Sequence, residues 1–215
     1  MHQPHESGDL RLTWGEYWRL GLLAAARWGG RMASMWGWLL AMCFACAQPA
    51  QVILLRHGEE PGDKTNVHLS ARGEARALGL ATLLGTNSVL TTNAPVAAVY
   101  AARVSKNGRG YRSGETMAPL GKALGLPVST PCESDEYRHL IRAILHNKDY
   151  SGKTVVVCWT HEYLPDLAQA LGVTPRPPPW RDKVYDRLWI VRPKKEGPPD
   201  FQDVPQRLLK NDAKR

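Results

Sequence analysis

From Gln51 onward, short apolar runs alternate with longer segments that have helical periodicity. The runs QVILL (51–55) and KTVVVCW (153–159) are almost wholly apolar, which is typical of strands buried on both faces of a parallel sheet. VAAVYAA (96–102) and DRLWIVR (186–192) predict two further strands. Strands that alternate with helices of this length favour an α/β domain with a mostly parallel central sheet.

Four segments between these strands predict helices. The first follows Ser70, a residue type that caps helix N-termini well, and ends at Gly85. The other three helices are expected over residues 114–126, 135–147 and 164–172.

The chain is expected to have three parts. A length of 215 residues suits one medium domain with extensions. Residues 1–50 form a leader, residues 51–193 form the α/β domain, and residues 194–215 form a basic, Pro-, Lys- and Asp-rich surface extension.

The leader has the shape of a secretory signal peptide. Its apolar stretch follows Arg27 and Arg31 and ends in Ala45-Cys46-Ala47, a small-residue cleavage pattern. The stretch is too interrupted to predict a membrane span. We therefore expect a secreted or periplasmic protein. The alternative is a retained membrane-surface helix on a cytoplasmic or membrane-associated protein.

The cysteines and the net charge limit the classes of ligand that the sequence predicts. Cys43 and Cys46 lie in the leader, and a bridge between Cys132 and Cys158 is an open alternative for an exported chain. No metal-ligand spacing is present, so no metal or cofactor is expected. The formal net charge of +8 favours anionic ligands, but no nucleic-acid-binding motif accompanies it.

Reactive side chains follow the ends of three predicted strands. Arg56-His57-Gly58-Glu59 follows the first, Thr160-His161-Glu162 follows another, and a basic loop that contains Arg112 follows the strand at 96–102. Ligands of open parallel sheets collect at the carboxyl ends of the strands. Arginine binds phosphate bidentately and stays charged, so the pattern predicts a site for a phosphoryl dianion.

Four motifs together resemble the histidine phosphatase superfamily, the phosphoglycerate mutase-like proteins with an RHG motif. They are, in chain order, LLRHGEEP, LSARGEARAL, RSGET and VVVCWTHEYLPDLAQALG, and they cover residues 51 to 192. The resemblance implies a three-layer α/β/α sandwich and a metal-independent phosphatase mechanism. Ten residues separate Gly58 from Leu69, fewer than in the mutases, which favours a small phosphatase-like member.

The resemblance also implies roles for individual residues. His57 would be the nucleophile that forms a phosphohistidine intermediate, as befits a neutral imidazole near neutral pH. Arg56, Arg112 and His161 would hold the phosphoryl oxygens, and Gly58 would let the backbone pass close to the imidazole ring. Glu162 departs from the family, which usually has glycine after the second histidine.

The general acid is less well defined by the sequence. The leaving oxygen needs a proton, and family members often place the donor between the second arginine and the second histidine. Asp135 is our prediction, with Glu133 and Glu136 as alternatives. Asp135 and Glu136 could equally be first-turn helix residues that face the helix dipole. Glu59 is a further alternative. Glu115 is expected to support Arg112 or the helix start.

The predicted function is hydrolysis of a phosphomonoester on a small molecule or a phosphoprotein. The sequence does not specify the substrate, because substrate specificity resides in loops. The alternative is a phospho-ligand binding protein of the same fold that has lost turnover. Neither the oligomeric state nor a partner is specified.

Overall fold

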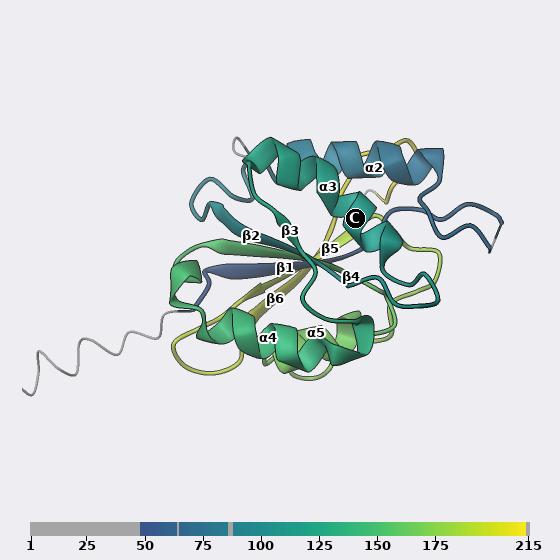
Figure 1. Ribbon diagram of the computed structural model, residues 1–215. Coiled ribbons are helices and arrows are strands. Elements are labelled where there is room, and N and C mark those ends of the chain that lie inside the picture. The colour runs from purple at the N-terminus through teal and green to yellow at the C-terminus, as the bar shows by residue number, and fades with distance from the viewer. Residues whose placement is uncertain (1–47, 64, 86–87, 214–215) are drawn as a thin grey trace, which may run out of the picture. The chain divides into compact units, whose positions relative to one another are not determined.

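The computed structural model describes residues 48–63, 65–85 and 88–213, and these form three layers around a central sheet (Figure 1). Within this part the sheet has six strands in the order β3-β2-β4-β1-β5-β6. The strands are β1 (Gln51–Arg56), β2 (Val96–Ala101), β3 (Val128–Ser129), β4 (Thr154–Trp159), β5 (Arg187–Arg192) and β6 (Asp200–Pro205).

Helices cover both faces of the sheet. In Figure 1, α2 and α3 lie on one face and α4 and α5 on the other. Two short 3₁₀ turns, Ser134–Glu136 and Lys148–Tyr150, flank α4. The helices are α2 (Ala71–Leu83), α3 (Tyr111–Leu124), α4 (Tyr137–His146) and α5 (Leu164–Ala170).

The alternation of side chains along β1 explains the two cores. Val52 and Leu54 pack into the cluster that includes α4 and α5, while Ile53 and Leu55 pack into the cluster that includes α2 and α3. All four side chains are fully buried, and burial of each stabilises the fold by about 1.5–3 kcal/mol. A strand buried on both faces reads as a continuous apolar run, as this one does.

Strand direction places the candidate residues at one edge of the sheet. β4 pairs in parallel with both β1 and β2, and β2 pairs in parallel with β3. β5 is antiparallel to β1, and β6 is antiparallel to β5. The predicted α/β/α sandwich with a mostly parallel sheet is confirmed. The carboxyl ends of β1, β2 and β4 therefore lie side by side.

Helix α3 begins earlier than the sequence pattern predicted. Its first residue is Tyr111 rather than Gly114, because Gly110 turns the chain with a φ of 102°. A Cβ at Gly110 would collide with the carbonyl oxygen of Arg103, so the turn requires glycine. The consequence is that Arg112 lies in the first turn of α3. The predicted start of α2 is confirmed, since the Ser70 hydroxyl accepts from the Gly73 amide at 3.1 Å.

The segment after Pro193 differs from the expected surface extension. Residues 200–205 form β6, an edge strand of the sheet. Asp212 beyond it is buried against Arg76 of α2. β6 was not predicted because its sequence is polar. Most of its residues are exposed or only half buried, and an edge strand needs no apolar run. Pro205 at the strand's end fits such an edge position.

The cysteine bridge considered for an exported chain is absent from the described residues. Cys132 and Cys158 are both free and buried. Cys132 belongs to the core on the α4 and α5 side, whereas Cys158 belongs to the core on the opposite face. The sheet separates the two thiols, so the bridge is ruled out in this fold.

The predicted leader lies outside the described residues except for its last three. Of these, Pro49 forms an isolated bridge with Ser151. Signal cleavage and export therefore stay predictions. No helix in the described part of the chain is long and apolar enough to cross a membrane. No group of three or more His, Cys, Asp or Glu side chains among residues 48–213, with the gaps given above, is placed to hold a metal ion.

Candidate active site

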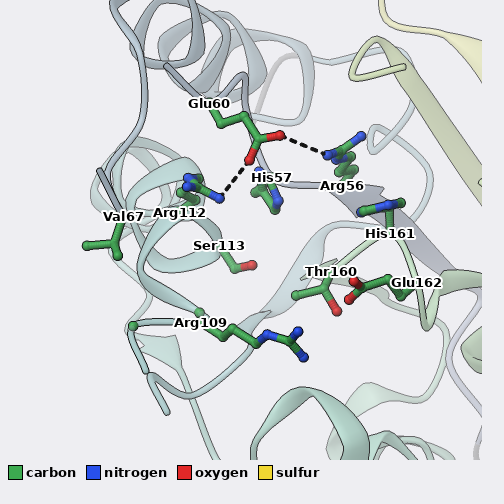
Figure 2. A pocket seen from close by; sticks show the side chains of 12 residues that line it. Arg56, His57, Glu60, Val67, Arg109, Arg112, Ser113, Thr160, His161 and Glu162 are labelled. Atoms are coloured by element: carbon green, nitrogen blue, oxygen red, sulfur yellow. Dashed lines mark hydrogen bonds and ion pairs between the residues drawn. The ribbon is translucent and has the colours of Figure 1, made fainter. Parts of the chain in front are cut away.

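A cavity of about 160 Å³ opens where β1 and β4 end (Figure 2). It brings together Arg56, His57, Arg112 and His161, which the sequence placed at separate strand ends. The full lining is Arg56, His57, Glu60, Val67, Gly108, Arg109, Gly110, Arg112, Ser113, Thr160, His161 and Glu162.

His57 is held as a neutral imidazole with one defined tautomer. Its side chain is only 6% exposed, and its Nδ1 lies 2.8 Å from the carbonyl oxygen of Gly58. Burial, followed by the charges of Arg56 and Arg112, lowers the pKa of His57 to about 4, although the Gly58 carbonyl opposes the shift. The neutral ring donates from Nδ1 to this carbonyl. Nε2 is therefore left with its lone pair and can act as a nucleophile.

The turn after His57 is fixed by contacts to α2 and α3. The Gly58 amide donates to the Thr116 hydroxyl at 2.8 Å, and this hydroxyl donates to the Arg112 carbonyl at 2.6 Å. A Cβ on Gly58 would lie 2.8 Å from the carbonyl oxygen of Gly73. Glycine is required here because the turn packs directly on the backbone of α2, and not only because of the neighbouring ring.

Arg56 is a buried cation whose Nε lacks a hydrogen-bond partner among the described residues. Its side chain is 2% exposed, and its Nη1 donates to the carbonyl of Asp182. The guanidinium carbon lies 4.1 Å from the ring centroid of Tyr185, within range of a cation–π contact. Burial lowers the pKa of Arg56, and the nearby Tyr185, Glu60 and Asp182 oppose the shift. Its Nε finds no partner among the described residues, so a bound anion could accept from it.

Arg112 is positioned by the loop that precedes α2. Its Nη2 donates to the Asn66 carbonyl at 2.8 Å and its Nε donates to the His68 carbonyl at 3.2 Å. The remaining Nη1 donates to the Glu60 carboxylate at 2.9 Å, drawn as a dashed line in Figure 2. Arg112 is thus oriented by two backbone carbonyls, while its Nη1 pairs with Glu60 in the cavity.

His161 and its neighbours form the opposite wall. Nε2 of His161 lies 3.1 Å from Oδ1 of Asp182. The hydroxyl of Thr160 is buried and has no partner among the described residues. Glu162 and Arg109 extend toward this wall from two different segments (Figure 2). The cavity therefore combines three arginines and two histidines with two carboxylates.

The three candidate acids between Arg112 and His161 lie outside this cavity. Asp135 and Glu133 line a neighbouring cavity of about 140 Å³, and Arg109 lines both. Glu136 accepts from the Glu133 amide at 2.9 Å and from Arg103 at 3.2 Å, as expected of a residue that caps a helix. The structure does not bring Asp135 into contact with His57.

The other two candidate carboxylates support the backbone. Burial alone would raise the pKa of Glu59, but hydrogen bonds from Arg76 and Arg72 outweigh it and lower this pKa. A carboxylate held in this way is a poor proton donor. Glu115 accepts from the Leu69 amide at 2.9 Å and thereby supports the loop before α2 rather than Arg112.

Three residues of the site were not found from the sequence: Glu60, Asp182 and Tyr185. Glu60 comes directly after Glu59, and of these two only Glu59 was a candidate acid, because it is next to the RHG motif. Asp182 and Tyr185 belong to the irregular segment before β5. Asp182 is 126 residues from Arg56 in the chain, and Tyr185 is 125 residues from Glu60. Loops carry no periodic signal, so only the folded arrangement reveals these contacts.

Comparison with known proteins gives similarities to solved structures alone. No family model and no curated protein matches the chain. A structure of the protein histidine phosphatase SixA with tungstate is 17% identical, with a TM-score of 0.47, over 73% of this chain and 97% of the other. A mycobacterial glucosyl-3-phosphoglycerate phosphatase with inorganic phosphate is 13% identical, with a TM-score of 0.47, over 72% and 95%.

A putative phosphohistidine phosphatase SixA from Agrobacterium tumefaciens is 16% identical, with a TM-score of 0.42, over 72% of this chain and 97% of the other. Each of these three similar structures is described as a phosphatase.

Proposed function

We propose that the protein hydrolyses phosphomonoesters through a phosphohistidine intermediate on His57. One observation carries the proposal: His57, buried and with Nδ1 2.8 Å from the Gly58 carbonyl oxygen, lies in one cavity with Arg56 and Arg112. A cavity with this cationic lining suits the transferred phosphoryl group, whose charge is spread over three oxygens. Preorganised donors of this kind supply most of what phosphoryl transfer needs.

The reaction has two steps. In the first, the lone pair of His57 Nε2 forms a bond to phosphorus while the bond to the ester oxygen breaks. In the second, water attacks the phosphohistidine, phosphate leaves, and the lone pair returns to Nε2. The hydrogen bond from Nδ1 to the Gly58 carbonyl stabilises the positive charge that the ring develops during attack.

The test compares the full chain with its His57→Asn variant. Release of p-nitrophenol from its phosphate ester is followed between about pH 4 and 8 with EDTA present. We expect metal-independent turnover that the variant loses, together with phosphate on His57 in base-quenched samples analysed by mass spectrometry. Equal turnover in the two proteins would contradict the proposal.

A different result supports the phospho-ligand binding alternative. In that case the full chain binds vanadate with an affinity that Arg112→Ala abolishes, and it releases no product from any phosphomonoester. Calorimetry measures this binding without relying on turnover.

A further inference from the structure

The carboxylate of Glu60 lies between the two arginines proposed to hold the phosphoryl group (Figure 2). Its Oε2 accepts from Arg112 Nη1 at 2.9 Å, and its Oε1 lies 3.8 Å from Arg56 Nη2. The hydroxyl of Tyr185 also donates to Oε1, at 3.1 Å. In this state Glu60 supplies the negative charge that a bound phosphoryl group would bring.

A bound dianion must take these arginine donors from Glu60. The arginines are the fixed partners, because Arg56 is 2% exposed and Arg112 is oriented by two backbone carbonyls. The Glu60 side chain is 43% exposed and lies in a stretch without regular secondary structure. The carboxylate is therefore the group that moves when an anion enters.

Displacement changes the charges that surround Glu60. In the free protein its carboxylate faces Arg56 from β1, Arg112 from α3 and Tyr185 from the segment before β5, with His57 and Asp182 beside Arg56. After displacement the arginine charges are neutralised by the ligand, and the nearest charge is the phosphoryl dianion. Loss of cationic partners and a nearby like charge both favour the protonated carboxyl.

Position also separates Glu60 from the other acids. Among the described carboxylates, only Glu60 and Glu162 line the cavity that contains His57. Of these two, only Glu60 contacts the arginines expected to hold the phosphoryl oxygens. Glu60 is thus the cavity carboxylate that is paired with the groups proposed to hold the phosphoryl oxygens.

We propose that Glu60 is the proton donor to the leaving group, an assignment that rests on the proposed phosphatase function. A phosphomonoester dianion displaces the carboxylate from Arg56 and Arg112, and Glu60 then takes up one proton from solvent. As the P–O bond breaks with its electron pair, Glu60 gives this proton to the leaving oxygen. The resulting carboxylate takes a proton from the attacking water as phosphate leaves His57. Glu60 then releases this proton to solvent when it pairs again with Arg56 and Arg112, so both Glu60 and His57 return to their starting forms.

The first experiment counts protons. Phenylphosphonate, a dianion that cannot be hydrolysed, is titrated into the full chain in two buffers of different ionisation enthalpy. The pH is set above the second ionisation of the ligand, so a proton taken up goes to the protein. We expect uptake of about one proton per ligand, which Glu60→Gln abolishes, and binding about tenfold tighter in this variant because no carboxylate is displaced. Uptake that persists in Glu60→Gln would overturn the assignment.

The second experiment varies the leaving group. The kcat/KM of an aryl phosphate, whose leaving group needs little protonation, is compared with that of an alkyl phosphate. In Glu60→Gln we expect a loss that is about a hundredfold larger for the alkyl ester than for the aryl ester. kcat/KM reports the transfer to His57 and is insensitive to later attack by water.

Two matched variants make the result decisive. Glu162→Gln removes the same charge from the same cavity, and Asp135→Asn removes the acid that the sequence favoured. Both are expected to keep the alkyl-to-aryl ratio of the unmodified chain. A leaving-group-dependent loss in either one, with none in Glu60→Gln, overturns the proposal. Turnover of the aryl ester that survives His57→Asn would instead contradict the proposed function itself.

Discussion

Arg76 of α2 and Asp212 form an ion pair inside the protein, with Nη2 2.8 Å from Oδ1 and side chains that are 1% and 2% exposed. The same guanidinium binds Glu59 at 2.7 Å, and Glu59 follows the turn that carries His57. Asp212, 136 positions from Arg76 in the chain, thus helps to fix the backbone next to His57.

We expect Asp212→Asn to lower the free energy of unfolding by about 3 kcal/mol, because it leaves a buried cation partly uncompensated. Hydrogen bonds from Arg76 outweigh burial and lower the pKa of Asp212 to about 2, from 3.8. This stabilisation is therefore complete above about pH 4 and is lost as the pH falls toward 2.

Urea unfolding at neutral and acidic pH measures the effect of Asp212→Asn. Asp203→Asn is the control, since Asp203 is exposed and pairs with Arg187 at the surface. Asp203→Asn should lower the free energy of unfolding by less than about 1 kcal/mol. An equal loss of unfolding free energy in the two variants would show that the buried pair stabilises the fold no more than the surface pair.

His57 should titrate with a pKa of about 4 in the free protein. Since this value lies below the ordinary 6.5, His57 lowers the stability of the fold as the pH falls from about 6.5 to about 4. NMR of the imidazole, assigned by comparison with His57→Asn, gives the value. Added phosphate should raise it, because a dianion stabilises the imidazolium. A free-protein pKa near 6.5 would mean that His57 is exposed to solvent.

Replacement of Gly58 by alanine should reduce kcat at least about tenfold, since a Cβ there meets the Gly73 carbonyl and displaces the turn that carries His57. Gly62→Ala is the matched control, because a Cβ at Gly62 has no atom within 4 Å. Phosphomonoester turnover and the melting temperature are measured for both. If Gly58→Ala turns over normally, the close packing on α2 does not position the nucleophile.

Cys132 and Cys158 should both be recovered as free thiols. Burial raises the pKa of Cys158 to about 12, so its thiol should resist alkylation until the protein unfolds. Peptide mass mapping after alkylation with and without denaturant, and without reductant, tests this. A Cys132–Cys158 linked peptide would contradict the separation of the two thiols by the sheet.

The fold was predictable because its elements obey simple periodicities. The apolar runs at β1 and β4 mark strands buried on both faces, and Ser70 and Gly85 bracket α2 where expected. β6 was missed because an edge strand can be polar along much of its length. The start of α3 was misplaced because the turn at Gly110 depends on a contact with Arg103 that no local pattern records.

The candidate site was predictable to the extent that strand ends define it. Arg56, His57 and His161 follow two neighbouring parallel strands, and parallel strands end at one edge of the sheet. The carboxylates that line the cavity were not predictable, because they depend on which loop side chains face it. Glu59 and Glu60 are adjacent in the chain, yet one pairs with α2 and the other with the cavity arginines.

The strand order has a consequence for how the site comes into being during synthesis. β4 lies between β1 and β2 in the sheet but follows both in the chain. Until residues 154–159 have emerged from the ribosome, β1 and β2 each present an unpaired edge, and His161 is not yet in place beside His57. We therefore expect nascent chains that end before β4 to be inactive and prone to aggregation, with the cavity assembled only once this strand inserts.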